Sequence, residues 1–287
     1  MGDESTVLTA ADARHLLRRT GFGAPAKEVA KILQRGDTRG SAADRLLDFK
    51  PGAFQPAGKD LRLRQNSWIK YMIGTKTPLQ EKLVLFWHDH FATAASKVGD
   101  VKLMAAQNRL LRRSCKGSFR TLLQEINRDP AMMEFLDTVR NHRRTPNENY
   151  GRELCELFAL GVKDSNGTPN YLQEDVVQLA RAFTGWSVDR ETGQYMFRRG
   201  IHDYGVKTVL GKSGNLDGDQ VIDILLRKPE TAQFITRKLW KEFISPVPDE
   251  AQVVKMAAEF RDSGYNIAKL MRIMLTSDAF YSMDNRA

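Results

Sequence analysis

Residues 78–91 read PLQEKLVLFWHDHF, and this stretch decides the fold class. An α-helix turns by about 100° per residue, so Leu83, Phe86, Trp87 and His90 fall within one quarter of its circumference. An apolar stripe of this kind is typical of a helix that packs against a protein core. The stretch therefore predicts an amphipathic helix whose buried face includes a histidine.

The same helical period recurs along the chain between capping and helix-breaking residues. Thr9 is expected to cap a first helix that ends near Gly21. A different pattern follows Trp186, because SVDRETGQYMF alternates around a Glu-Thr-Gly turn and predicts a hairpin. Further helices are expected near 25–35, 41–48, 61–73, 78–90, 100–115, 118–128, 147–160, 171–184, 217–227, 230–244, 249–262 and 266–276.

These elements predict a mainly α fold, with a single compact multi-helix domain over 1–287 and a small β-hairpin insertion near 186–210. The segment 50–59 is rich in Pro and Gly and is a candidate for a short linker. The chain has 287 residues, of which 41% are hydrophobic and 28% charged. This composition supplies a full core and excludes fibrous and disordered classes.

The formal net charge of +9 favours anionic partners, but the basic residues are interleaved with acidic ones. No nucleic-acid-binding motif is evident, so nucleic acid is not an expected partner. The sequence as given shows no signal peptide and no run of roughly 18 apolar residues, so we expect a soluble protein without a transmembrane segment. Cys115 and Cys155 are expected to be buried free thiols.

The histidine pair His88 and His90 is a first candidate for metal binding. On an unbroken helix the two imidazoles point in nearly opposite directions and cannot reach one metal ion. They could do so only if the helix ended or unwound at Asp89. The alternatives are a hydrogen-bonded core histidine at 90 and a helix-end histidine at 88.

The stretch NENYGRELCELFALG at 147–161 places an amide, a guanidinium and two carboxylates on one helical stripe. These groups belong to Asn149, Arg152, Glu153 and Glu156. Two carboxylates beside an arginine suit metal ligation, general acid and base catalysis, or a structural ion-pair network in which Arg152 pairs with Glu156. Tyr150, Leu154, Leu157 and Phe158 are expected to form a neighbouring apolar face.

Two later stretches are candidates to converge on this stripe. YLQEDVVQLARAFTGW at 171–186 places Glu174, Gln178 and Arg181 on one helical face before it breaks ahead of Trp186. GIHDYGVKTVLG at 200–211 brings His202, Asp203 and Lys207 close together. A carboxylate beside an imidazole can orient one ring nitrogen for metal binding or for general base catalysis. The alternative is a solvated loop.

The order of these motifs resembles the bacterial family DUF1800 of domains of unknown function. The resemblance covers nearly the whole chain, from ARHLLRRTGFG at 13–23 through FWHDHF and the motifs above to KPETAQFITRKLW and SDAFY. It implies that WHDHF, 149–158, 183–186 and 202–207 are signature regions, and it supplies no established catalytic residue. It also implies that relatives are often exported and often encoded beside an uncharacterised protein similar to sulfatases and phosphatases.

The leading hypothesis is a buried His/Glu/Arg polar site, with hydrolysis by a metal-dependent enzyme as the simplest reaction and oxidation as a second. Zinc, iron or manganese would suit mixed carboxylate and imidazole ligands. Arg152 and Lys207 would hold an anionic substrate group. The candidate catalytic residues are Glu153, Glu156, Arg152 and Lys207; the candidate metal ligands are His88, His90, Glu153, Glu156, His202 and Asp203; Asn149 and Trp186 complete the polar pocket.

The competing hypothesis is a non-catalytic binding or assembly protein. In that case the polar residues lock helices together, and a basic face recruits a protein or another anionic partner. The stretches NRLLRRSCKGSFR and VRNHRR would supply this face. Its expected members are Arg109, Arg112, Arg113, Lys116, Arg120, Arg140, Arg143 and Arg144. The oligomeric state and the natural location of the protein stay open.

Overall fold

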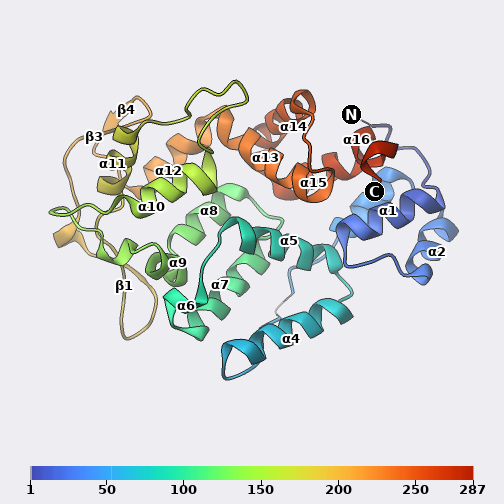
Figure 1. Ribbon diagram of the computed structural model, residues 1–287, viewed down its shortest axis with the longest axis horizontal. Helices are drawn as coiled ribbons and strands as arrows, with labels where there is room; N and C mark the ends of the chain where they lie inside the picture. The colour runs from blue at the N-terminus through green and yellow to red at the C-terminus, as the bar shows by residue number, and fades with distance from the viewer. Residues whose placement is uncertain (1, 53, 287) are drawn as a thin grey trace. The chain divides into compact units, whose positions relative to one another are not determined.

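A computed structural model describes residues 2–52 and 54–286, and in it the chain forms two compact units (Figure 1). The first unit comprises Met1–Trp87, Leu111–Phe119 and Ile235–Ala287, and the second comprises His88–Leu110 and Arg120–Phe234. The prediction of a mainly α fold is confirmed. The single domain over 1–287 and the linker over 50–59 stay predictions, and residue 53 of that segment lies outside the described residues.

The first unit is built from helices with side-chain caps at several of their ends. Thr9 caps α1 as predicted. Its side chain accepts a hydrogen bond from the Asp12 amide, and the Thr9 amide donates to the Asp12 carboxylate. The helices with residues in this unit, besides one end each of α7 (Val101–Ser114) and α8 (Phe119–Asn127), are α1 (Ala10–Thr20), α2 (Ala26–Arg35), α3 (Arg39–Leu47), α4 (Leu61–Gly74), α5 (Pro78–His90), α13 (Pro229–Phe243), α14 (Glu250–Asp262), α15 (Ile267–Thr276), α16 (Asp278–Tyr281) and the 3-10 turn η4 (Met283–Asn285).

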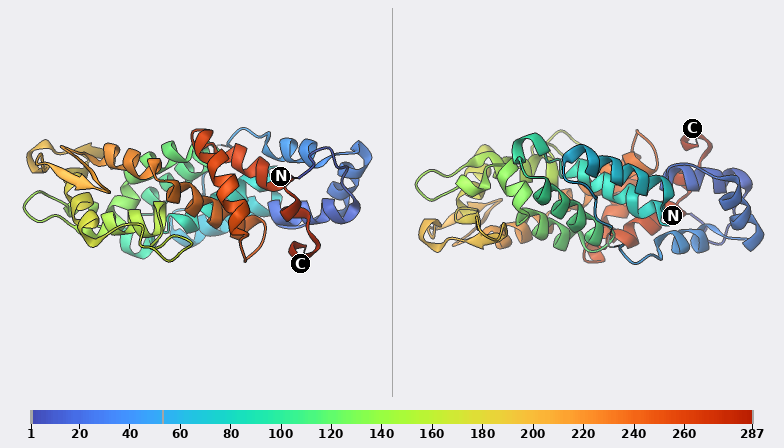
Figure 2. Two further views of the ribbon diagram at one scale, coloured as in Figure 1. Left: turned by 90° about the horizontal axis from the view of Figure 1, so that it is seen from above. Right: turned by 90° about the horizontal axis from the view of Figure 1, so that it is seen from below.

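Aromatic side chains form the core of the first unit. The rings of Trp87 and Phe119 stack with centroids 5.7 Å apart, and the Trp87 indole donates to the Cys115 carbonyl at 2.8 Å. Phe119 also contacts Phe260. Helices α14 and α15 pack side by side beside this core, as the orange and red ribbons show in Figures 1 and 2. The predicted buried face of 78–91 is confirmed at Trp87, which is fully buried.

The second unit carries the signature segments. Helices α10, α11 and α12 are neighbours, and strand β3 lies against α11 (Figure 1). Gly151 allows the close approach of α10 to α11, because a Cβ there would lie 3.1 Å from the Leu179 Cβ. The elements with residues in this unit, besides the ends of α5 and α13, are α6 (Ala95–Val98), α7 (Val101–Ser114), α8 (Phe119–Asn127), α9 (Pro130–Phe135), η1 (Thr138–Arg140), α10 (Glu148–Glu153), η2 (Leu154–Ala159), α11 (Gln173–Ala182), η3 (Arg199–Ile201) and α12 (Gly218–Arg227).

The helix predicted over 147–160 changes pitch after Glu153. α10 is α-helical, whereas η2 is a π-helix, and the Leu160 amide bonds the Cys155 carbonyl five residues back. The wider turn changes the direction of the side chains that follow it. Of the expected apolar face, Tyr150, Leu154 and Phe158 are buried, whereas Leu157 is 45% exposed.

Two antiparallel hairpins complete the second unit. β1 (Trp186–Val188) pairs with β2 (Tyr195–Phe197), which confirms the predicted hairpin. β3 (Lys207–Val209) pairs with β4 (Lys212–Gly214), a second hairpin that the sequence analysis missed. Its turn has positive φ at Leu210 and Gly211. Leucine rarely adopts that conformation, so the turn carries no familiar sequence signal.

Both cysteines are free and buried, as predicted. Cys115 lies in the first unit and Cys155 in the second. Both are fully enclosed.

Candidate functional site

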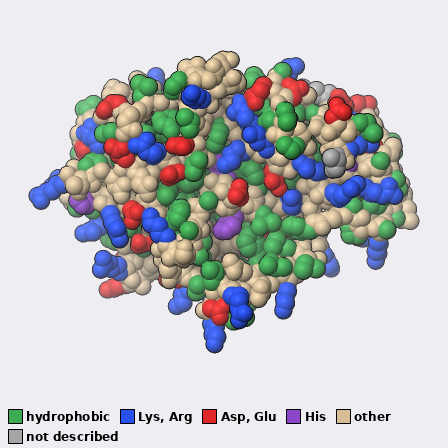
Figure 3. Space-filling model, viewed as in Figure 1, with side chains coloured by type: hydrophobic (Ala, Val, Ile, Leu, Met, Phe, Trp, Pro, Cys, Tyr) green, Lys and Arg blue, Asp and Glu red, His purple; other side chains and the backbone are tan. Residues whose placement is uncertain are grey.

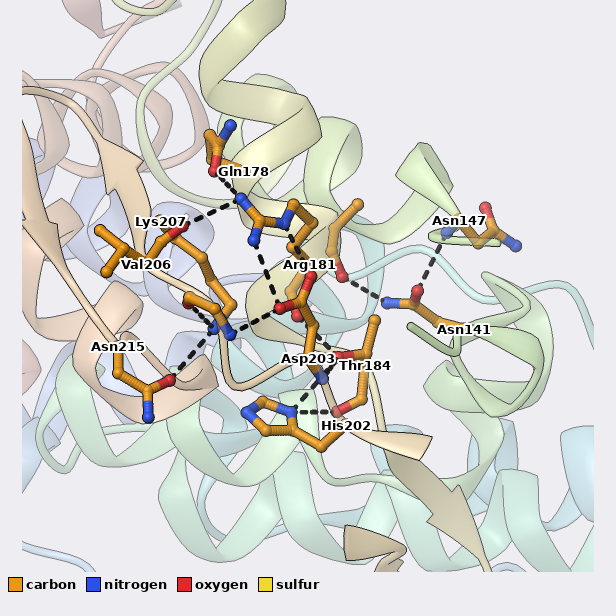
Figure 4. A network of polar contacts seen from close by, with 12 residues as sticks. Asn141, Asn147, Gln178, Arg181, Thr184, His202, Asp203, Val206, Lys207 and Asn215 are labelled. Carbon is orange, nitrogen blue, oxygen red and sulfur yellow. Dashed lines mark hydrogen bonds and ion pairs between the residues drawn. The ribbon is translucent and has the colours of Figure 1, made fainter. Parts of the chain in front are cut away.

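The residues of the predicted loop 202–207 gather around Arg181 of α11 (Figure 4). The Arg181 Nε donates to Asp203 Oδ2 at 2.7 Å and its Nη2 donates to Oδ1 at 3.3 Å. Its Nη1 donates to Gln178 Oε1 and to the Val206 carbonyl. The Arg181 guanidinium holds the pKa of the Asp203 carboxyl below its ordinary value. We call this set, Gln178, Arg181, Thr184, His202, Asp203 and Lys207, the Arg181 network.

His202 is oriented by a backbone carbonyl and not, as the sequence led us to expect, by Asp203. Its Nδ1 lies 2.7 Å from the Thr184 carbonyl oxygen, which can only accept, so Nδ1 carries the proton and donates. The Asp203 carboxylate is taken by Arg181, while the Asp203 amide donates to Thr184 Oγ1 at 2.8 Å. Figure 4 shows the Nε2 side of the ring pointing away from Thr184 and Asp203.

Glycines explain why the signature segments can pack so tightly here. A Cβ on Gly205 would lie 2.8 Å from Arg181 Nη2 and 3.0 Å from Asp203 Oδ1. Gly185 has a φ of +87°, and a Cβ there would lie 3.1 Å from the His202 Cβ. Both positions therefore favour glycine for physical reasons.

Lys207 is buried, and its ammonium bonds within the protein. Nζ donates to the Gly205 carbonyl at 3.1 Å and to Asn215 Oδ1 at 3.4 Å. Burial lowers the pKa of Lys207, and the Asp203 carboxylate opposes that effect. The arrangement stabilises the loop that leads into β3.

Glu153 and Glu156 lie on either side of the change from α- to π-helix. Arg152 does not form the expected pair with Glu156. It donates instead to Glu148 Oε2 and to Gln173 Oε1, both at 3.0 Å. Glu148 lies one regular turn before Arg152, whereas the π-helix after Glu153 alters the spacing toward Glu156. Arg152 therefore bonds Glu148 and Gln173 in place of Glu156.

Glu153 and Glu156 interact electrostatically with each other. Burial raises the pKa of the half-buried Glu153, the neighbouring Glu156 raises it further, and Arg152 opposes the shift. Glu156 Oε2 accepts from the Tyr171 hydroxyl at 3.4 Å. Burial and Glu156 together raise the pKa of Tyr171 to about 12, so this hydroxyl remains a hydrogen-bond donor. Sequence reasoning missed Tyr171, although it stands at the start of the quoted 171–186 stretch.

The remaining predicted site residues have structural contacts in the second unit. His90 is buried, and its Nε2 lies 3.2 Å from the Phe158 carbonyl oxygen. Burial lowers the pKa of His88, two residues earlier on the same continuous helix. The Asn149 side-chain amide donates to the Leu136 carbonyl at 3.2 Å. Trp186 is buried between the rings of Phe183 and Tyr195, with centroids at 5.0 and 5.2 Å.

The donors expected for a metal do not gather into one cluster. Among residues 2–52 and 54–286, no group of three or more His, Cys, Asp or Glu side chains is placed to hold a metal ion. The residues present therefore do not fit the expected zinc, iron or manganese centre as a ready-made ligand set. The metal stays a prediction.

A cavity of about 780 Å³ lies beside the β1–β2 hairpin. Its lining includes Glu134, Arg140, Ser187, Asp189 and Arg198. None of the predicted catalytic or metal-binding side chains lines it.

The expected basic face does not form as a whole. Arg112 is buried and pairs with Glu81 in the first unit, with Nη2 2.9 Å from Glu81 Oε2. The predicted position of Arg112 on the basic face is therefore wrong, because its side chain is buried and bonded to the buried Glu81 carboxylate. Arg120 pairs with Asp223 in the second unit. Figure 3 shows basic side chains interspersed with acidic ones over the visible face.

Arg181 and Thr184 are the central residues that sequence reasoning underrated. The sequence placed Arg181 on a polar helical face, but spacing alone could not show that its partner lies 22 residues later. Thr184 lay within the FTGW signature, where its hydroxyl and carbonyl had no visible role. Asn141 was also missed; its side chain links the Ala180 carbonyl to the Asn147 amide.

Together the fold and site define a class of mainly helical proteins whose polar signature segments surround one helix, α11. None of the described helices combines the length and apolarity that a membrane span needs. The family model for "Protein of unknown function (DUF1800)" matches residues 15–287. The chain therefore belongs to the DUF1800 family. No curated protein and no solved structure matches it.

Proposed function

We propose that the chain is an acid–base enzyme of the hydrolase type, with Glu153 and Glu156 as its proton-transferring groups. The observation that carries the proposal is the raised pKa of Glu153, caused by burial and by the adjacent Glu156 carboxylate. Desolvation combined with a specific charged neighbour is typical of catalytic carboxyl groups. A π-helical segment next to such groups is also frequent at functional sites.

The two carboxyl groups have different surroundings. Glu153 retains its proton to higher pH and serves as the acid. Glu156 accepts a hydrogen bond from the Tyr171 hydroxyl, which orients its carboxylate, and it serves as the base that activates water. Arg152 lies beside the pair with its side chain 41% exposed, so it can hold an anionic substrate group. Lys207 in the same role stays a prediction.

Matched glutamine variants test this assignment. Glu153→Gln and Glu156→Gln each replace an ionisable carboxyl group by a neutral amide, and Glu259→Gln does so on α14, at a residue that has no part in the proposed site. Hydrolysis of p-nitrophenyl acetate and p-nitrophenyl phosphate would be followed against pH. We expect a loss of about 100-fold or more for each of the first two variants and little change for Glu259→Gln. Equal activity in all three folded variants would remove the proposal.

The divalent metal has its own test, which does not depend on a substrate. Chelator-washed wild type and a Glu153→Ala, Glu156→Ala double variant would be compared by elemental analysis, with folding checked by circular dichroism. Near-stoichiometric zinc, iron or manganese that is lost in the folded variant would support a metal-dependent reaction. Equal metal content in both proteins would show that Glu153 and Glu156 do not bind a metal.

A binding or assembly role is the second proposal, supported by basic side chains that remain exposed. The Arg140 side chain is 80% exposed, and Arg143 and Arg144 follow it at the surface. Long-range attraction to an acidic protein, such as a sulfatase- or phosphatase-like partner, would use such groups. Binding to such an acidic protein should weaken as the salt concentration rises and in the Arg143→Gln, Arg144→Gln double variant, and this result would support the role. Binding that is insensitive to both would oppose it.

A further inference from the structure

Helix α4 presents one long face that no part of the described chain covers. None of its residues is buried. At about 100° per residue, Arg62, Leu63, Asn66, Ile69, Lys70 and Ile73 share one arc of about 120°. All six are exposed, with Leu63 at 40%, Ile69 at 50% and Ile73 at 81%.

The opposite face of α4 is tied to the first unit. The Trp68 indole donates to Glu81 Oε2 at 2.8 Å, and the Tyr71 ring stacks on Phe54 with centroids 4.0 Å apart. The Arg64 guanidinium donates to the Pro56 carbonyl at 3.2 Å. These contacts fix the rotation of the helix, so the aliphatic and basic side chains of the other arc stay outward.

Basic residues predominate in and beside α4. Residues 59–76 carry a net charge of +4, with Lys59, Arg62, Arg64, Lys70 and Lys76 set against Asp60. The helix has two basic residues besides Arg64, and both of them, Arg62 and Lys70, lie on the outward face. The single carboxylate in this range caps the helix, because Asp60 Oδ1 accepts a hydrogen bond from the Leu63 amide at the helix N-terminus. Figure 3 shows Lys and Arg side chains protruding at this edge of the molecule.

From this placement we propose that the outward face of α4 docks on an anionic lipid surface. Aliphatic side chains that insert at the headgroup boundary, with basic side chains among them and at both ends, are typical of helices that lie in the membrane interface. The basic groups would attract acidic headgroups, and Leu63, Ile69 and Ile73 would enter the acyl boundary. The helix lies on the bilayer and does not cross it. This role is independent of the Glu153 site.

Vesicle co-sedimentation tests the proposal with the full chain. The probe is a vesicle of phosphatidylcholine mixed equally with phosphatidylglycerol, compared with pure phosphatidylcholine. We expect the protein to pellet with the mixed vesicles only. Arg62→Gln with Lys70→Gln should lower the partition coefficient about 30-fold, and Ile69→Ser with Ile73→Ser should lower it about tenfold or more.

Val254→Ser with Lys255→Gln on the exposed side of α14 is the matched control, and it should bind as the wild type does. No binding to the mixed vesicles, or binding that both α4 variants leave unchanged, would overturn the proposal. Light scattering on the same proteins separates another occupant. A wild-type dimer that Ile69→Ser with Ile73→Ser converts to monomer, without vesicle binding, would assign the face to a second copy and also overturn it.

Discussion

The guanidinium of Arg181 contacts both carboxylate oxygens of Asp203, at 2.7 and 3.3 Å, and so joins helix α11 to the segment that begins at His202. Both side chains are largely shielded from solvent, with 25% and 18% exposure. Two parallel N–H···O bonds of this kind are stronger and more directional than a neutral hydrogen bond. The contact holds the segment that begins at His202 against a helix residue that lies 22 positions earlier than Asp203 in the sequence.

Asp203→Ala should lower the free energy of unfolding by about 1–3 kcal/mol near neutral pH, because it leaves Arg181 without its carboxylate. The folded pKa of Asp203 lies below its ordinary 3.8. Its contribution is therefore present above 3.8 and is lost as the pH falls through the folded pKa. Urea unfolding of both proteins across this range measures the difference. A difference that persists at the acid end would contradict the ion-pair explanation.

Glu81→Gln should cost more, about 3–5 kcal/mol, because it removes the carboxylate charge that faces the buried Arg112 guanidinium. The side chains of Arg112 and Glu81 are 1% and 0% exposed. Glu4→Gln is the control, since the Glu4 and Arg272 side chains are 50% and 34% exposed and their pair should contribute under about 1 kcal/mol. Thermal unfolding of the two variants would show whether burial sets this order.

Glu153→Gln should make stability depend less on pH. Because the folded pKa of Glu153 is raised above its ordinary 4.5, its stabilising contribution is full below 4.5 and is lost as the pH rises through the folded pKa. The variant should match the wild type in acid and become relatively more stable at higher pH. Parallel unfolding curves from acid to neutral pH test this, and an unchanging difference between the proteins would refute the raised pKa.

His202 should hold its proton on Nδ1 when neutral. The carbonyl oxygen of Thr184, 2.7 Å from Nδ1, fixes this tautomer. Two-dimensional ¹⁵N–¹H spectra of the imidazoles distinguish the two nitrogens directly. His142, whose ring contacts only the Thr145 hydroxyl among the described hydrogen bonds, is an internal comparison. A neutral His202 protonated on Nε2 would show that the Thr184 contact is absent in solution.

Gly151→Ala should destabilise the second unit by about 1–3 kcal/mol through overpacking. The added methyl would lie 3.1 Å from the Leu179 Cβ and 3.2 Å from the Val176 carbonyl oxygen. Gly200→Ala is the control, because a methyl there meets nothing within 4 Å and should change stability by less than about 0.5 kcal/mol. Chemical unfolding followed by circular dichroism would compare them.

Much of the helical architecture was predictable because caps, prolines and apolar stripes are local signals. The helix predicted over 78–90 has those same bounds, and α12 begins within one residue of its predicted start. Local signals failed at short elements: α6, α9 and α16 have too few residues to show a period. They also failed at 154–159, where a π-helix replaces the regular turn.

The candidate site was predictable as a set of residue types but not as a set of partners. The sequence indicated that His202, Asp203 and Lys207 lie close together, and all three belong to the same network. It could not show that Asp203 would bind Arg181 and leave His202 to a backbone carbonyl. Carbonyl groups are present at every residue, so their selection depends on tertiary packing that spacing does not encode.

Each unit contains one cysteine, so the rate at which each unit opens can be measured through its own thiol. Burial raises the pKa of Cys115 to about 12 and raises that of Cys155 as well, so neither sulfur is a reactive thiolate near neutral pH. A thiol reagent can reach either sulfur only when its surroundings open. Pulsed alkylation read by mass spectrometry would therefore measure the opening rate of each unit separately, in the unaltered protein and within a single sample.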